Sequence, residues 1–241
     1  MDGSRALAEM SLGVDAGVVG EPTGLNVVVA QKGVLRWRVR TFGVAAHAAT
    51  PELGHNSIYD MGVVIEALRS AIEPTLTQTH HPRLGAGSWS IGTIAGGVAI
   101  NVVPERCEIE CDRRTLPGQS TEELLAVVDD ALEGVRVQHP HMRIAREPPF
   151  VDLPPVETTT DTPIVRAAQA ATSDVGGKIM GVPYGTDAAM LSGIGGIQCV
   201  VLGPGDIAVA HTDDEWVALD QVEAAVGVYI DVCHAFAEIV G

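Results

Sequence analysis

GVLRWRVRT, residues 33–41, is the stretch that decides the fold. In it, apolar Leu35, Trp37 and Val39 alternate with three arginines. Because successive side chains of a strand point to opposite faces, this alternation predicts a β-strand with one buried and one exposed face. The strand opens a series of elements that runs to about Glu147.

Outward from this strand, helix and strand patterns follow one another. A helix pattern runs from Ser57 to Ile72, with Asn56 or Ser57 as its N-cap. Further elements are predicted as strands at Ser88–Ala95 and Arg106–Arg114, a helix from Ser120 with Glu123 at capping-box spacing, and a strand at Val135–Ala145. The order β-α-β-β-α-β is that of ferredoxin-like modules, so we expect such a module here.

Predicted buried strands and helices flank the module on both sides. Before it, the apolar run Ala16–Gly20 predicts a buried strand that ends in a turn at Glu21–Gly24. After it, the pattern predicts a helix at Pro163–Ser173, a buried strand at Gly196–Leu202 and a long helix at Leu219–Ile239. We therefore expect an α/β protein in which residues 1–31 and 148–241 form one domain, interrupted by a module at 32–147.

Composition narrows the functional classes. With 241 residues and 46% hydrophobic content, the chain is long and apolar enough to bury a core. Its formal charge of −16 repels phosphate backbones and argues against a nucleic-acid partner, although simple solubility explains the acidity as well. No signal peptide or membrane span is predicted, so a soluble cytoplasmic protein is expected. The four cysteines are expected to be buried free thiols: Cys107, Cys111, Cys199 and Cys233.

Two residues stand where a metal ligand would be expected. Glu21 follows a predicted strand at its carboxyl end, where open α/β sheets bind ligands, and a carboxylate there can bind a cation. His211 follows a glycine-rich turn at Gly203–Gly205 and precedes an acidic run, which suits a metal ligand with a neighbouring carboxylate. An ordinary surface turn and a hydrogen-bonded loop histidine are the alternatives.

Five further residues are candidates for substrate contacts. His47 lies in a loop of small residues that lets a ligand or a second subunit approach its imidazole. Asn101 and Arg114 offer an amide and a guanidinium suited to a carboxylate, and Gly185 with Thr186 offers N–H groups and a hydroxyl. Structural roles remain open for all five. No nucleophile elbow, phosphate-binding loop or dinucleotide fingerprint is present.

Seven motifs in a fixed order give the chain a family resemblance. They are Gly20–Thr23, Gly43–Pro51, Gly54–Ile58, Gly96–Pro104, Asp112–Gly118, Tyr184–Ala188 and Gly203–Trp216. In this order they resemble the M20 metallopeptidase family, and within it the acetylornithine deacetylases and succinyl-diaminopimelate desuccinylases most of all. The resemblance covers essentially the whole chain.

The resemblance implies a zinc-peptidase-like catalytic domain with a ferredoxin-like lid through which the chain forms a homodimer. Glu21 would bind one metal ion and His211 the other, and His47 would reach across the dimer to polarise the scissile carbonyl. Asn101, Arg114 and the Gly185–Thr186 loop would hold an N-acylated amino acid or a small peptide. The implied cofactor is Zn²⁺, two per complete site, with Co²⁺ or Mn²⁺ as alternatives.

The sequence departs from the family pattern at its start. Family members carry a His-x-Asp motif, a bridging Asp and a Glu-Glu pair upstream of the Glu-Pro-Thr segment. Here only twenty residues precede Glu21, and none supplies these ligands. We therefore expect weak metal binding and no hydrolysis by this chain alone. A truncated gene product, one half of a split enzyme and a non-catalytic dimerising or amino-acid-binding module all remain open.

Overall fold

A computed structural model describes residues 2–10 and 13–241 and divides the chain into two compact units. Unit 1 comprises Met1–Gly33, His81–Gly85 and Leu153–Gly241. Unit 2 comprises Val34–His80 and Ala86–Asp152. Met1, Ser11 and Leu12 lie outside the described residues, so the prediction of no signal peptide at the N-terminus falls partly on residues that the structure does not describe.

Unit 2 is built from the six elements that the sequence predicts. They are β3 (Gly33–Phe42), α2 (Ser57–Leu76), β6 (Ser88–Gly96), β7 (Arg106–Thr115), α3 (Thr121–Gln138) and β8 (Arg143–Arg146), with the short η1 (Pro51–Leu53) before α2. The sheet order β6-β7-β3-β8 is the order of a ferredoxin-like module, and β9 (Val151–Leu153) also pairs with β3. A small ribbon is formed by β4 (His80–His81) and β5 (Gly85–Ala86).

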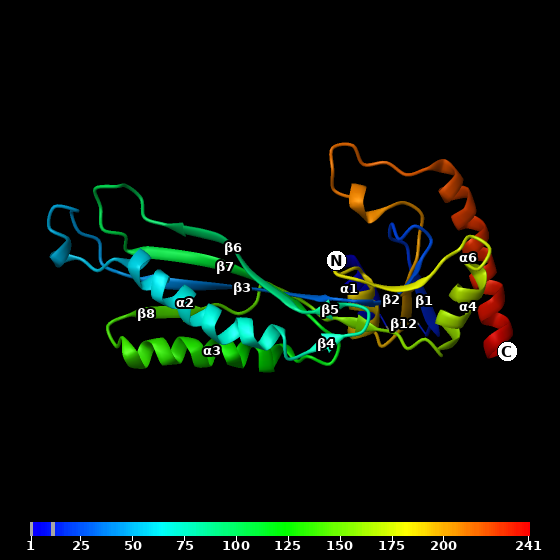
Figure 1. Cartoon of the computed structure of the whole chain (residues 1–241), viewed down its shortest axis with the longest axis horizontal. Coiled ribbons are helices and arrows are strands. Elements are labelled where there is room, and N and C mark those ends of the chain that lie inside the picture. The colour runs from blue at the N-terminus through cyan, green and yellow to red at the C-terminus, as the bar shows by residue number, and fades with distance from the viewer. Residues whose placement is uncertain (1, 11–12) are drawn as a thin grey trace. The chain divides into compact units, whose positions relative to one another are not determined.

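The alternation in β3 divides the faces of this sheet. Trp37 and Val39 are fully buried in one core with residues of α2 and α3, the two helices that lie side by side on one face (Figure 1). On the other face, arginines of β3 form ion pairs with carboxylates of β7, such as Arg36 with Asp112 at 2.6 Å. One apolar and one charged face follow directly from the period of two.

Capping residues set the starts of both helices. The Asn56 side chain accepts hydrogen bonds from the backbone N–H groups of Ile58 and Tyr59, and Ser120 accepts one from Glu123. The sequence predicted the Ser120 cap, and of the two candidates it offered for α2, Asn56 and Ser57, the structure shows Asn56. The predicted strand at Val135–Ala145 is wrong in its first half, because α3 continues to Gln138 and the strand begins only at Arg143.

Unit 1 is a mixed α/β layer. Its elements are α1 (Asp2–Glu9), β1 (Ala16–Val19), β2 (Val27–Gln31), β10 (Val156–Glu157), α4 (Pro163–Ala171), β11 (Ile179–Val182), α5 (Ala188–Gly193), β12 (Gln198–Val201), η2 (Ile207–Val209) and α6 (Leu219–Val240). The sheet has the order β1-β12-β2-β10, and β11 also pairs with β2. Helices α4 and α6 pack together beside this sheet (Figure 1).

The middle of this sheet is the strand that the sequence pattern did not reveal. All five residues of β2 are buried, so the strand has no polar face and no alternation. The cysteine prediction holds for Cys107, Cys111 and Cys199, which are buried free thiols, but is wrong for Cys233, which is exposed on α6. No helix in the described parts of the chain is long and apolar enough to cross a membrane.

Candidate active site

Two turns meet at one edge of the unit 1 sheet. Because β1 and β12 are parallel neighbours, the chain leaves both at the same edge, towards Glu21 after β1 and Gly203 after β12. The two turns are hydrogen-bonded to each other: the Thr23 N–H donates to the Gly203 carbonyl at 3.2 Å, and the Gly203 N–H donates to the Thr23 hydroxyl at 3.1 Å. Two segments 180 residues apart therefore form one structural unit.

Gly203 is required by the closeness of these turns. A Cβ at this position would lie 2.6 Å from the carbonyl oxygen of Glu21 and 3.1 Å from the Tyr229 hydroxyl. Real Cβ atoms essentially never approach a backbone oxygen so closely. The glycine therefore fixes where the backbone of Glu21 lies relative to the turn that leads to His211.

Charged groups gather around the Glu21 carboxyl. Burial raises the pKa of Glu21, the negative charge of Asp187 raises it further, and the nearby His211 lowers it. Burial also raises the pKa of Tyr184, as do the charges of Glu21 and Asp206. The charges of two carboxyl groups, Glu21 and Asp187, thus act on each other here and the His211 imidazole offsets part of that repulsion, an arrangement that a bound cation would stabilise.

His211 has an unusual backbone. Its φ of +63° lies in the left-handed region, which costs a residue with a side chain about 1 kcal/mol or more. The side chain is exposed in the loop between η2 and α6. Strain of this kind is retained in proteins mostly where it positions a functional group.

An open pocket of about 470 Å³ lies at this edge of unit 1. Glu21 and Asp206 contribute polar groups to its wall, and Trp216 and Tyr229 contribute rings. The Tyr229 hydroxyl donates to the carbonyl of Leu202 at 2.8 Å, which holds α6 against the end of β12. The pocket has the mixture of apolar walls and a few polar groups that small ligands require.

The Gly185–Thr186 loop is held from inside the protein. The Thr186 side chain is 2% exposed, and its hydroxyl donates to Oε1 of Gln31 at 2.6 Å and accepts from the Ala188 N–H at 3.2 Å. Its hydroxyl is therefore committed to the core, while Asp187, the next residue, accepts a hydrogen bond from Ser4 at 2.7 Å.

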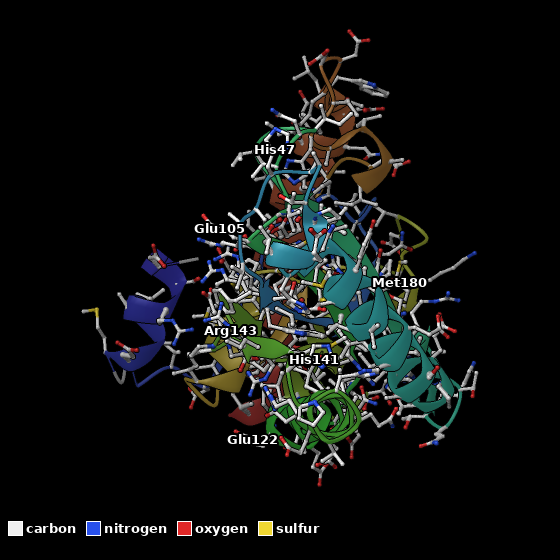
Figure 2. The ribbon with its side chains drawn as sticks, turned by 90° about the vertical axis from the view of Figure 1, so that its left-hand side faces the viewer. His47, Glu105, Glu122, His141, Arg143 and Met180 are labelled. Carbon is white, nitrogen blue, oxygen red and sulfur yellow. The ribbon has the colours of Figure 1, made fainter. Side chains whose placement is uncertain are left out.

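In unit 2 the structure brings His47 and Asn101 together. The Ala48 N–H donates to the Asn101 carbonyl at 2.9 Å, and His47 forms an isolated bridge with Val102. His47 is exposed on its loop (Figure 2). Its Nδ1 accepts the Ala49 N–H at 3.0 Å, so a neutral ring carries its proton on Nε2, which can donate to a ligand.

Arg114 is already paired with a carboxylate. Its Nε donates to Asp112 at 2.8 Å, and the same carboxylate accepts from Nε of Arg36 at 2.6 Å. Two guanidinium groups thus share one carboxylate, which leaves positive charge at the end of β7 available for an anion.

Comparison with known proteins identifies this architecture. A family model described as the peptidase dimerisation domain of the M20 family matches residues 29–140. The chain contains an M20 peptidase dimerisation domain. The chain is 31% identical over 214 residues to an acetylornithine deacetylase of Aliivibrio fischeri, and 32% identical over 213 residues to one of Vibrio cholerae. Each match covers 88% of this chain but 55% of the relative, so the chain spans little more than half the length of these relatives.

Solved structures share the M20 fold. An aminopeptidase from Bacillus cereus superposes with a TM-score of 0.74 at 20% identity, over 98% of this chain and 62% of that one. The dipeptidase Dug1p from Saccharomyces cerevisiae gives a TM-score of 0.75 at 12% identity, over 99% of this chain and 63% of its own. In such M20 peptidases the dimerisation domain is inserted in the catalytic domain, which confirms the predicted fold class and agrees with the M20 resemblance.

The M20 resemblance implies two metal ions, and the donors at the unit 1 edge fit that chemistry in kind but not in number. Glu21 and His211 are the ligand types that zinc accepts, and Asp187 adds a second acidic group that the sequence had not singled out as a ligand. Among the residues that the structure describes, however, the three-residue group close enough to share an ion is His55, Asp60 and His141, in unit 2.

Proposed function

We propose that the chain is part of a metal-dependent amidohydrolase that removes an acyl group from an N-acylated amino acid, as a deacetylase or desuccinylase does. The single observation that carries the proposal is the joining of the Glu21 turn to the turn that leads to His211. The proposal is supported by the names of the curated relatives, which are acetylornithine deacetylases. The domain boundaries proposed from the sequence divide the work between a catalytic part, 1–31 and 148–241, and a lid, 32–147.

We assign Glu21 to one Zn²⁺ ion and His211 to the other, with Co²⁺ or Mn²⁺ as replacements. When bound, these ions supply Lewis-acid activation of water and of the scissile carbonyl. The raised pKa of Glu21 supports this role, because a cation beside a partly buried carboxylate removes the cost of its charge. The carboxylate of Asp187, whose charge acts on Glu21, adds negative charge that would also attract these cations.

His47 acts on the substrate carbonyl in this proposal. As water attacks the acyl carbon, negative charge develops on the carbonyl oxygen, and this charge is lost again when the C–N bond breaks and the amine leaves with a proton from the water. The Nε2–H group of His47, fixed as a donor by the bond at Nδ1, stabilises that charge. As the M20 resemblance implies, we propose that His47 serves the active site of the partner in a homodimer.

The remaining candidates hold the substrate. Asn101 lies on the loop joined to that of His47, and Arg114 offers donors not used by Asp112. The Thr186 hydroxyl is bonded to Gln31, so we propose that the Gly185–Thr186 loop contacts the substrate through its backbone. An N-acyl amino acid has one carboxylate and one carbonyl oxygen for these groups to bind.

Because the described residues offer few metal ligands at this edge of unit 1, we propose that the 241 residues alone bind Zn²⁺ weakly there and hydrolyse nothing. Catalytic zinc commonly has three protein ligands, and here each ion would have one. A split enzyme, or a dimerising or amino-acid-binding module, is the alternative. Homodimerisation through the lid and a cytoplasmic location belong to the same proposal.

The proposal is tested by joining this chain behind the upstream segment of the Vibrio cholerae relative and measuring acyl release with Zn²⁺. N-acetyl and N-succinyl amino acids serve as substrates. Turnover is expected from the joined protein, with a fall of about 100- to 1000-fold in kcat for His47→Ala at unchanged zinc content. A folded, zinc-loaded dimer that releases no acyl group would refute the proposal.

A further inference from the structure

The N-terminal end of α2 holds a second group of potential metal ligands, separate from Glu21 and His211. Ligand atoms of His55, Asp60 and His141 all lie within 4.8 Å of one another. All three residues belong to unit 2, whereas Glu21 and His211 belong to unit 1. The sequence had left both histidines of this group without a role.

Local structure explains how His55 meets Asp60. With Asn56 as the N-cap of α2, His55 directly precedes the cap and Asp60 is the fourth helical residue. Side chains at these two positions commonly pack against each other at a helix start. Here the pair is polar: the His55 Nε2 and the Asp60 Oδ2 lie 2.6 Å apart, and the Asp60 side chain is only 4% exposed.

Strand pairing brings in His141 from the other end of unit 2. Phe42 of β3 lies opposite Arg143 of β8, and this pairing brings the turn before β8, which carries His141, to the end of β3 that leads to Val44. The backbone of Val44 exchanges hydrogen bonds with that of His55, at 2.8 and 2.9 Å. The His55 and His141 rings therefore meet edge to face with centroids 5.2 Å apart, and His141 lies between α2 and the end of α3 (Figure 2).

We propose that His55, Asp60 and His141 bind a divalent cation of the zinc type. Two imidazoles and one carboxylate are a donor set that zinc accepts, with water completing a tetrahedral shell. The exposed His141 leaves that fourth position open to solvent. His139 stands beside the site, its ring centroid 6.1 Å from that of His141.

A hydrogen bond between His55 and Asp60 alone would need no third partner. What favours a cation is the convergence of a second imidazole on a buried carboxylate, since the negative charge of Asp60 is costly without a compensating positive charge. Bound there, the ion joins the start of α2 to the α3–β8 turn, and it stabilises unit 2 by binding only the folded form.

Calorimetric titration of the full chain with Zn²⁺ tests the site, using His141→Ala and the control His80→Ala. His80 follows the C-terminal end of α2, and roughly 24 Å of helix separates Asp60 from that end. We expect wild type and His80→Ala to bind one ion at this site with equal affinity, apart from the weak binding proposed at Glu21 and His211, and His141→Ala to lose more than about 10-fold in affinity at this site. His141 is exposed, so its loss leaves the fold intact.

A second readout identifies the ligands directly. In ¹⁵N NMR spectra of the wild-type chain, added Zn²⁺ is expected to shift the ring nitrogens of His55 and His141 and to leave those of His80 unchanged. Identical isotherms for wild type and His141→Ala, or zinc-dependent shifts confined to other histidines, would overturn the proposal. The proposed hydrolase function stands or falls separately, because its assay requires none of these three residues.

Discussion

Gly203→Ala is the substitution that most directly disturbs the junction between the two turns of unit 1. The added methyl group would lie 2.6 Å from the Glu21 carbonyl oxygen and 3.2 Å from its nitrogen. These are backbone atoms of a segment tied by hydrogen bonds, so neither can rotate away as a flexible side chain would. One of the two turns must move.

The cost follows from the contacts that such a movement breaks. Overpacking alone costs roughly 1–3 kcal/mol. The Gly203 carbonyl also accepts from the N–H groups of Thr23 and Leu25, and its own N–H donates to the Thr23 hydroxyl. If the movement weakens one of these bonds, at about 1 kcal/mol, we expect a total loss of about 3 kcal/mol. For a chain of this length, that loss lowers Tm by roughly 10 °C.

Thermal and urea unfolding measure this loss, and Gly227→Ala is the matched control. Gly227 lies on the exposed side of α6 in the same unit, and a Cβ there would meet nothing within 4 Å. Replacing a helical glycine by alanine is expected to stabilise by about 0.5–1 kcal/mol. If Gly203→Ala were as stable as Gly227→Ala, the two turns would not be packed as described.

Three further predictions concern single side chains. Thr186→Val should destabilise the protein by about 1–3 kcal/mol in urea unfolding, because it leaves the side-chain Oε1 of Gln31 without its donor. Thr186→Ser should recover most of this stability, and equal stability of the two variants would contradict the buried hydrogen bond. Native-state alkylation should modify Cys233 alone, since it is exposed while burial raises the pKa of the Cys111 thiol to about 12; rapid labelling of a second thiol would be inconsistent with the packing. The pKa of Glu21 is raised above its ordinary 4.5, so the folded state keeps this proton to higher pH than the unfolded state does, and metal-free stability should fall as pH rises from about 4.5 through the raised pKa. In urea unfolding between acidic and neutral pH, Glu21→Gln should remove the part of the decrease in unfolding free energy that Glu21 causes. An unchanged pH profile would show that the pKa of this carboxyl is not raised.

Sequence patterns predicted the elements that have one apolar and one polar face. The alternation in β3 and the caps Asn56 and Ser120 are local signals, and each stands where it was expected. The misplaced strand had a local cause as well. Val135 continues the helical spacing of Leu132 and earlier buried residues of α3, so packing on the sheet outweighed the short strand-like run.

What the sequence did not reveal depends on contacts between distant segments. β2 is buried on both faces and carries no period to detect. Asp187 belongs to the Tyr184–Ala188 motif, but its effect on the pKa of Glu21 depends on the fold, which brings the two residues together. The grouping of His55 with His141 likewise depends on the pairing of β3 with β8. The Thr186 hydroxyl, predicted to face substrate, is bonded to Gln31 within the core.

The measurement that bears most directly on the central claim is zinc binding at the unit 1 edge. It uses the His141→Ala chain, so that the proposed site in unit 2 does not contribute, and compares it with the same chain carrying Glu21→Gln or His211→Gln. The account predicts weak zinc binding by the His141→Ala chain, which each second substitution lowers further. A tight two-site isotherm, or weak binding that neither substitution changes, would contradict the assignment of Glu21 and His211 to two incomplete metal sites.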